Sequence, residues 1–387
     1  MRLTTFHAVC LYRRDKIIHA HLQDPHLVLS TCRVAGGLRR DLEYVLNHQS
    51  CEPAGHHRQL ALRDPVAYRE MICERAGLPP ERCATMGTAA NMHNAALVRR
   101  GFRDLEVLAV ATGGVETNAG RAGDPASVVE TAAGFEKVES DSALPGPGTI
   151  NIMLFFSHPL TEAALVRTVI TATEAKTAVL QELAVNSRYS SQPATGTGTD
   201  QIIVAAPDRD GFRLSSAGKH AKLGELIGTS VKAAVRETLG RQNRLTAAGQ
   251  CSVTIHLERF GCTGKNLLQG ISGHLTGEQA RLLADNFRDM DRDPVTVAAV
   301  AALAHLADKL TWGILPAGCR QEILGAAAAQ VACSVGGRWQ ALAHYREQLG
   351  PAADAGDGAT FCALCCRALA LGFADKWEED GGKRSTP

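Results

Sequence analysis

The apolar positions of the chain fall into runs that predict strands and helices. Residues 105–111 (LEVLAVA), 148–156 (GTINIMLFF) and 202–206 (IIVAA) are continuous apolar runs, typical of strands buried on both faces. Residues 160–183 form a run too long for a strand and predict a helix between the second and third strands. Strands that alternate with helices indicate a layered α/β core, with an α+β arrangement as the alternative.

The N-terminal part of the sequence predicts a few short antiparallel strands followed by helices. Residues 4–32 alternate in a way that favours extended segments joined by turns. Residues 39–48 (RRDLEYVLNH) predict a short helix. Asp64 and Pro65 then provide an N-cap and a first-turn proline for a helix that ends at Gly77.

The pattern changes after about Gly240. Apart from residues 252–257 (SVTIHL), the remainder is rich in Ala and Leu and carries helix signals such as the capping box that begins at Thr276 and the N-cap Asp293. We expect four or five packed helices there. We therefore divide the chain into an α/β domain, residues 1–261, and an all-helical C-terminal region, residues 262–387, with a disordered tail.

Charge and composition exclude several classes of protein. The 41 basic and 40 acidic residues give a formal net charge of +1, which is unsuited to a nucleic-acid or other polyelectrolyte partner. The chain starts without a signal-peptide pattern, and no window reaches 18 uncharged apolar residues. We expect a cytoplasmic protein that binds neither nucleic acid nor a membrane.

The 12 cysteines are expected to be buried thiols rather than a disulfide framework, as is usual for a long cytosolic chain. Cys362, Cys365 and Cys366 would share one face of a helix. The cysteine and histidine spacings within residues 51–83 are too irregular for a zinc site. We predict no metal site.

The first candidate binding segment is the glycine-rich loop of residues 111–124 (ATGGVETNAGRAGD), directly after a predicted strand. Loops beyond strand ends build the ligand crevice of layered α/β folds. Its candidate residues are Thr112, Glu116, Thr117, Asn118, Arg121 and Asp124.

The second segment is residues 194–200 (ATGTGTD). It precedes a strand and lacks Gly-Lys-Ser/Thr, so a phosphate-binding loop is disfavoured. Its backbone amides and hydroxyls suit an oxyanion or an amide-rich ligand, and an ordinary pair of turns is the alternative. Its candidate residues are Thr195, Gly196, Thr197, Gly198, Thr199 and Asp200.

The third feature is the helix predicted over residues 160–183. Its apolar stripe consists of Leu165, Val166, Val169, Ile170, Thr173, Leu180 and Leu183. Lys176 falls inside this stripe and Glu174 on its flank. A lysine there must extend to water, pair with an anion, or accept a lowered pKa.

Taken in order, the segments resemble one family. They are STCRVAGG (30–37), VLNH (45–48), ATGGVETNAGRAGD (111–124), GTINI (148–152), TEAKTAVLQEL (173–183), ATGTGTD (194–200), AGKHAKLGELIG (217–228) and LERFG (257–261). The set is similar to adenosylcobinamide amidohydrolase, the CbiZ family of corrinoid salvage, and covers roughly residues 30–261. The resemblance implies hydrolysis of the amide that joins aminopropanol to the corrin ring, which releases adenosylcobyric acid.

Amide hydrolysis needs an activated water or nucleophile, donors for the oxyanion and an acid for the leaving amine. By this chemistry the base is Asp200 or Glu116, with Glu174 as a further carboxylate. Lys176 or His220 would stabilise charge or protonate the amine.

The oxyanion site would combine Asn118 with the backbone amides of Gly196 and Gly198. The remaining candidates for substrate contacts are Thr112, Arg121, Asp124, Asn151, Thr195, Thr197 and Thr199. No cofactor is expected, because the small-molecule substrate is itself a cobalt corrinoid. Homo-oligomerisation is left open.

Two alternatives stand beside this hypothesis. One is an amidohydrolase that acts on another amide with Thr195 as its nucleophile, activated by cleavage after Ala194. The other is a corrinoid-binding protein without catalytic activity. The loop residue Glu116 is the least typical of the family pattern, since small residues are expected there.

Overall fold

A computed structural model describes residues 1–387 except 51–55, 133, 139–145, 355 and 378–387. The chain divides into two compact units. The first consists of Met1–Tyr189 and Pro193–Thr246, and the second of Ser190–Gln192 and Ala247–Pro387. The tail predicted to be disordered, residues 378–387, lies outside the described residues.

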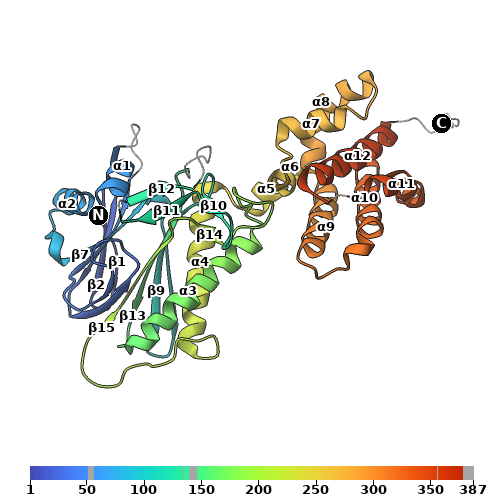
Figure 1. Ribbon diagram of the computed structural model, residues 1–387. Helices are drawn as coiled ribbons and strands as arrows, with labels where there is room; N and C mark the ends of the chain where they lie inside the picture. The colour runs from blue at the N-terminus through green and yellow to red at the C-terminus, as the bar shows by residue number, and fades with distance from the viewer. Residues whose placement is uncertain (51–55, 133, 139–145, 355, 378–387) are drawn as a thin grey trace, which may run out of the picture. The chain divides into compact units, whose positions relative to one another are not determined.

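Two sheets form the body of the first unit (Figure 1). The five-stranded sheet has the order β1 (Arg2–Phe6), β2 (Val9–Arg14), β3 (Ile17–Leu22), β6 (Tyr44–Gln49) and β7 (Cys83–Thr88). The six-stranded sheet has the order β5 (Gly37–Arg39), β4 (His26–Ser30), β15 (Gln201–Pro207), β13 (Thr149–Phe156), β9 (Leu105–Gly114) and β8 (Ala96–Phe102).

Each sheet contains one parallel strand pair, and the crossover between the two strands supplies a layer of helices. Strands β6 and β7 are parallel and are joined through α1 (His56–Arg63) and α2 (Pro65–Ala76). Strands β13 and β15 are parallel and are joined through α3 (Glu162–Glu182). A parallel pair needs such a crossover, because a short turn cannot return the chain to the same end of the sheet.

The buried residues show four layers. Val110, Met153 and Ile203 of the six-stranded sheet share one core cluster with Val45 and Met86 of the five-stranded sheet, so the two sheets pack face to face. The outer face of the five-stranded sheet is covered by α2. The layered α/β class predicted from the sequence is therefore confirmed.

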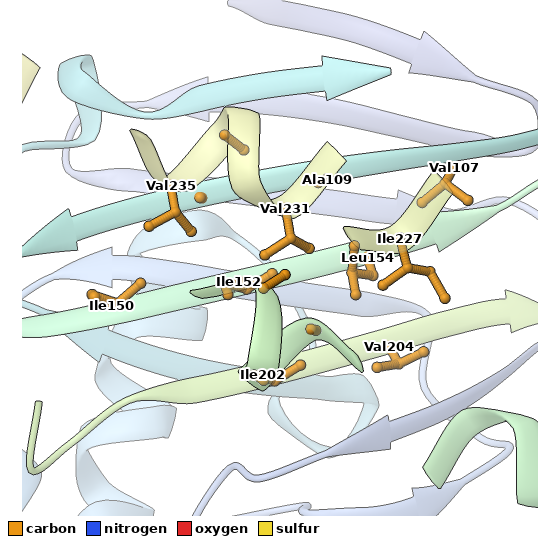
Figure 2. Packing of buried hydrophobic residues seen from close by; sticks show 14 of the residues in the cluster. Val107, Ala109, Ile150, Ile152, Leu154, Ile202, Val204, Ile227, Val231 and Val235 are labelled. Carbon is orange, nitrogen blue, oxygen red and sulfur yellow. The ribbon is translucent and has the colours of Figure 1, made fainter. Parts of the chain in front are cut away.

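The outer face of the six-stranded sheet is covered by α3 and by α4 (Lys222–Asn243). Figure 2 shows Ile227, Val231 and Val235 of α4 directed toward apolar side chains of β9, β13 and β15. All eight residues of β13 are buried, alternately toward the helices and toward the other sheet. The continuous apolar run of this strand follows from burial on both faces.

The second unit is all-helical, as predicted for the C-terminal region. Its described residues form α5 (Ala247–Gln250), α6 (Val253–Leu257), α7 (Gly264–Ser272), α8 (Gly277–Arg292), α9 (Pro294–Thr311), α10 (Arg320–Gly336), α11 (Leu342–Leu349) and α12 (Gly358–Trp377). These eight helices exceed the four or five expected. The predicted caps are present, since Thr276 and Gln279 form the capping box of α8 and Asp293 caps α9.

Two segments differ from the sequence prediction. Residues 39–48 were expected to be helical, but the chain forms the end of β5 and most of β6. Val45 faces the other sheet and Leu46 faces α2, so this segment lies between two layers. Successive side chains of a strand point to opposite faces, which allows both to be buried. Residues 252–257, expected to interrupt the helices, contain helix α6.

The division between the units falls after Thr246, whereas the sequence analysis placed it after Gly261. Val253 and Leu257 are fully buried in the core of the helical unit. Burial of these two side chains assigns residues 247–261 to the second unit.

The cysteines are not all thiols. Cys262 and Cys362 form a disulfide within the second unit, so the prediction that Cys362 belongs to a face of thiols is wrong. Its helical neighbours Cys365 and Cys366 are buried thiols, as expected. The pairing joins residues 100 positions apart, which no local spacing in the sequence could indicate.

Helix α12 is long and apolar enough to cross a membrane by length and composition alone. Half of its most apolar window is buried inside the protein, as in a core helix of a folded domain. Phe361, Leu364 and Leu369 are among the buried side chains.

Candidate active site

The two glycine-rich loops singled out in the sequence lie side by side. Strand β10 (Ala119–Gly120) from the first loop pairs with β14 (Gly196–Thr197) from the second, and Gly120 stands opposite Gly196. The Thr195 N–H donates to the Gly120 carbonyl at 2.8 Å. Two segments that are far apart in the sequence are thereby joined next to the end of β9 and the start of β15, two interior strands of the six-stranded sheet.

Beside these two segments, Lys176 of α3 forms an ion pair with Asp200. The Lys176 side chain is 8% exposed and that of Asp200 12%. Asp200 Oδ1 accepts from the Ile150 N–H at 2.8 Å and from the Thr197 hydroxyl at 2.6 Å. Oδ2 accepts from the Thr197 N–H at 3.0 Å and from Lys176 Nζ. The carboxylate therefore has a donor for each of its roughly four lone-pair positions.

Of the three possibilities for a lysine on this stripe, the structure shows pairing with an anion, because Lys176 is buried and its partner is Asp200. Transfer of an isolated ammonium into the interior is very costly, and a hydrogen-bonded carboxylate offsets that cost. The pair is held by three elements, since Lys176 comes from α3, Asp200 directly precedes β15, and Ile150 lies in β13.

Gly196 is required by the same pair. A Cβ atom at position 196 would lie 2.6 Å from Asp200 Oδ2 and 2.8 Å from Lys176 Nζ. Both distances are shorter than real Cβ contacts, so a side chain could be accommodated only if the pair moved. The glycine thus allows the loop backbone to lie directly over the charged groups.

A second network surrounds Asn118, which is 1% exposed. Its Nδ2 donates to the Gly148 carbonyl at 2.9 Å, and its Oδ1 accepts from the Tyr189 hydroxyl at 2.7 Å. The Thr199 hydroxyl donates to the same Gly148 carbonyl at 2.8 Å. Asn118 therefore joins the start of β13 to the loop that carries Thr199 and to Tyr189.

A third network is buried between the two sheets. Asn47 of β6 donates to the Thr112 hydroxyl at 2.8 Å, and Asn151 of β13 donates to Asn47 Oδ1 at 2.9 Å and to the Gly87 carbonyl at 3.1 Å. Within the described part of the chain, no partner is found for Asn151 Oδ1. A buried acceptor without a donor is costly and is typical of functional positions.

Asn47 was missed as a site residue. Its segment VLNH belongs to the family resemblance, but the local sequence pattern predicts a helix there. The signal that could have found it is a pair of polar residues, Asn47 and His48, inside an otherwise buried strand. The amide of Asn47 reaches Asn151 only because β6 and β13 face each other across the inter-sheet core.

Arg121, Asp124 and Thr195 bind neighbouring segments of the loops. Asp124 Oδ2 accepts from the Arg121 N–H at 2.7 Å and from the Ser187 hydroxyl at 2.6 Å. Arg121 Nη1 donates to the Pro193 carbonyl at 3.0 Å, and the Thr195 hydroxyl accepts from the Ala122 N–H at 2.9 Å. These contacts fix the shape of the loops around the Lys176–Asp200 pair.

Among the described residues, no hydrogen bond or ion pair joins this pair to three of the candidate catalytic residues. Glu116 and His220 are exposed. Glu174 is on the outer face of α3 and pairs with Lys219 at 2.7 Å, and the hydrogen bond from Lys219 lowers the pKa of its carboxyl. The structure therefore brings together Lys176 and Asp200 but not these three residues.

The helical stripe of α3 was only partly predicted. Val166 and Ile170 are 55% and 42% exposed, whereas Thr168 and Ala172 are fully buried. The buried face is rotated from the predicted one because α3 packs on both the sheet and α4, and small residues allow the close approach. Lys176 lies within the buried face in both descriptions.

The described residues contain no group of three or more His, Cys, Asp or Glu side chains that could hold a metal ion. Cys73 and Cys83 are buried neighbours within the fold, and a hydrogen bond from Cys83 lowers the pKa of the Cys73 thiol. Cys51 lies outside the described residues.

Comparison with known proteins agrees with this arrangement. A layered α/β unit with a charged pair beneath polar glycine loops is compatible with a hydrolase. Residues 2–247 match the family described as adenosylcobinamide amidohydrolase, CbiZ. The chain belongs to this family, and the match ends within one residue of the end of the first unit. The segment LERFG (257–261), one of the motifs of the sequence resemblance, lies outside the match.

One relative is an uncharacterized protein of Methanocaldococcus jannaschii. It is 34% identical over 210 residues, which cover 53% of this chain and 80% of the relative. The name of this relative states no reaction.

Proposed function

We propose that the protein hydrolyses the amide bond between the corrin ring and the aminopropanol group of adenosylcobinamide. Water adds to the amide carbonyl, the C–N bond breaks, and the products are adenosylcobyric acid and the free amine. Membership of the amidohydrolase family supports this reaction. We further propose that it serves corrinoid salvage in the cytoplasm and that no resident cofactor is needed, because the cobalt arrives with the substrate.

The observation that carries the proposal is the buried Lys176–Asp200 pair beneath the loop of residues 194–200. An ammonium group has three N–H donors, and hydrogen bonding within the described residues engages one of them, toward Asp200. The others can be directed at the oxyanion of the tetrahedral intermediate or at the leaving amine. A preorganised cation in a partly dehydrated site is more effective there than in water.

Asp200 orients Lys176 and is our proposed base. Thr197 donates its hydroxyl to Asp200 Oδ1, so a proton from the attacking water can reach the carboxylate through Thr197. Gly198 and Thr199 are exposed at the tip of the loop and are placed to meet the substrate amide. Glu116, Glu174 and His220 receive no part in this mechanism because they are exposed and make no described contact with the pair.

The direct test is incubation of the purified protein with adenosylcobinamide and separation of the products by chromatography. We expect adenosylcobyric acid and aminopropanol in equal amounts. Lys176→Met and Asp200→Asn should each lower kcat by about 100-fold or more, the usual cost of losing one transition-state donor. Lys219→Met and Glu182→Gln, at exposed ion pairs near the same helix, are the matched controls. Binding of the corrinoid without product would instead support a carrier.

The alternative with a threonine nucleophile is separated by intact mass. Cleavage after Ala194 would give two fragments, whereas our proposal expects a single chain of 41.1 kDa. Thr195→Val adds a kinetic test, because loss of its hydroxyl would abolish turnover in the alternative mechanism only.

A further inference from the structure

The helical unit contains three residues that lie shortly before the active-site loop of residues 194–200. Ser190, Ser191 and Gln192 group with Ala247–Pro387, although Tyr189 before them and Pro193 after them belong to the first unit. The family match ends at residue 247, so the residues that hold this segment lie outside the family's common part.

Within the helical unit, two side chains bind the segment. Arg259 Nη1 donates to the Ser191 carbonyl. Trp312, at the C-terminal end of α9, donates from Nε1 to Gln192 Oε1 at 3.2 Å. Arg259 belongs to LERFG (257–261), the motif of the sequence resemblance that lies outside the family match.

The guanidinium of Arg259 is held by an ion pair and by an aromatic ring. Asp308 of α9 accepts from its Nη1 at 2.7 Å and from its Nη2 at 2.8 Å. Both side chains are 7% exposed, and the guanidinium lies 4.2 Å from the centre of the Phe260 ring. A bidentate pair restrains the guanidinium in orientation as well as in position. One turn at the C-terminal end of α9 thus places Asp308 against Arg259 and Trp312 against Gln192.

The residues that flank the segment are bound to the active site. The Tyr189 hydroxyl donates to Asn118 Oδ1 at 2.7 Å, and its ring lies 3.2 Å from where a Cβ of Gly120 would be. On the other side, the Pro193 carbonyl accepts from Arg121 at 3.0 Å. Residues 194–200, with Asp200, follow directly.

We infer that Arg259 and Trp312 are positioning residues, by which the helical unit holds residues 190–192 and so fixes Tyr189 and the Asp200 loop in their catalytic arrangement. Arg259 acts through the Ser191 carbonyl and touches no reacting atom. The inference rests on the proposed function for its kinetic readout only. It gives the helical unit a part in the activity of a site whose residues all lie in the first unit.

The experiment compares Arg259→Met, Arg259→Lys and Trp312→Phe in the full-length protein, with Arg346→Met as the control. Arg346 is an exposed arginine of the helical unit paired with Glu322. Trp312→Phe keeps an aromatic ring and removes only the N–H donor, so it provides a test even if Arg259→Met leaves Asp308 unpaired and the helical unit unfolds.

The first readout is hydrogen exchange of the peptides that span residues 185–200. We expect faster exchange in Arg259→Met and Trp312→Phe at the Arg188, Ala194 and Thr195 amides, which donate to loop carbonyls in the first unit. Arg259→Lys should recover part of the protection. Exchange in Arg346→Met should equal that of the unmodified protein. This readout does not need an active enzyme.

The second readout is turnover of adenosylcobinamide. Displacement of the Asp200 loop should lower kcat by about tenfold in Arg259→Met with a smaller change in KM. If the unmodified protein gives no product, the proposed function fails while the exchange experiment still decides the inference. Folded Trp312→Phe and Arg259→Met proteins with unchanged exchange over residues 185–200 and unchanged kcat would overturn it.

Discussion

At the scale of single residues, the chemistry of the site depends on one buried charge and the groups that compensate it. Lys176 is buried on α3, and Asp200 balances its charge while accepting three further hydrogen bonds. Neither residue could be buried at acceptable cost without the other. This mutual dependence gives two predictions.

The first prediction concerns stability. Lys176→Met or Asp200→Asn alone should lower the free energy of unfolding of the first unit by about 3 kcal/mol, because each leaves the other polar group without its partner. The double variant should lose less than the sum of the two, since no uncompensated charge remains. Urea unfolding of the three variants measures the coupling. Additive losses would show that the two groups do not interact.

The second prediction concerns Gly196. Gly196→Ala should displace the pair, since its Cβ would lie 2.6 Å from Asp200 Oδ2. We expect kcat/KM to fall by about 100-fold, as for a displacement of roughly 1 Å in an active site. Gly228→Ala in α4 is the control, because no atom lies within 4 Å of its Cβ position. Equal activity of the two variants would contradict the geometry.

The sequence indicated some of these residues and missed others for a physical reason. Helical periodicity placed Lys176 on a buried face, because a helix turns by a constant angle per residue. Asn47 was not found, since its partner Asn151 is 104 positions away and in another sheet. Glu116, Glu174 and His220 were included by chemistry alone, and exposure separates them from the pair.

At the scale of elements, the parallel strand pairs determine which surfaces are covered. The crossover from β13 through α3 to β15 brings Lys176 over the start of β15, where Asp200 lies. Residues 39–48 show the limit of local pattern, because their polar and apolar residues fit a short helix as well as a strand. Burial on both faces decides for the strand.

The buried histidine of strand β4 predicts how the stability of the first unit depends on pH. His26 is 1% exposed, and its burial lowers the pKa of the imidazole below the usual 6.5. The unfolded chain therefore binds the proton more readily, and the first unit should lose stability as the pH falls from about 6.5 toward the lowered value. His19, whose pKa is also lowered by burial, adds to the same trend.

Urea unfolding between pH 7.5 and 5.5 measures this dependence. His26→Gln should flatten the decline, because glutamine has no proton to gain, and the share due to His19 should remain. His93→Gln, at an exposed position, should keep the full slope. A profile of His26→Gln that falls as steeply as that of the unmodified protein would contradict the assignment.

At the scale of the whole molecule, the two units have separate hydrophobic cores. The first carries the family match and the candidate site. The second has its own disulfide, Cys262–Cys362, which closes a loop of 100 positions.

The disulfide predicts a selective effect of reduction. Loss of a cross-link over a loop of this length usually costs about 2–4 kcal/mol. A reducing agent should therefore lower the unfolding transition of the helical unit and leave that of the first unit in place. Mass spectrometry after blocking of free thiols during cell lysis checks the pairing directly, since Cys262 and Cys362 should remain unblocked. Blocking of both Cys262 and Cys362 would contradict it.

By itself, the sequence determined the elements that local pattern can encode. Strands buried on both faces need continuous apolar runs, helix ends need caps, and tight loops need glycine, so the β13 strand, the α2, α8 and α9 caps and the two glycine loops could be predicted. The ordered motifs also indicated the family.

Only the tertiary structure decided which of these pieces meet. The pairing of β10 with β14, the Lys176–Asp200 contact, the Asn47–Asn151 contact and the Cys262–Cys362 disulfide all join residues well separated along the chain. The assignment of Ser190–Gln192 to the helical unit is of the same kind. Such contacts depend on how layers pack, and packing is a property of the whole fold that no single segment specifies.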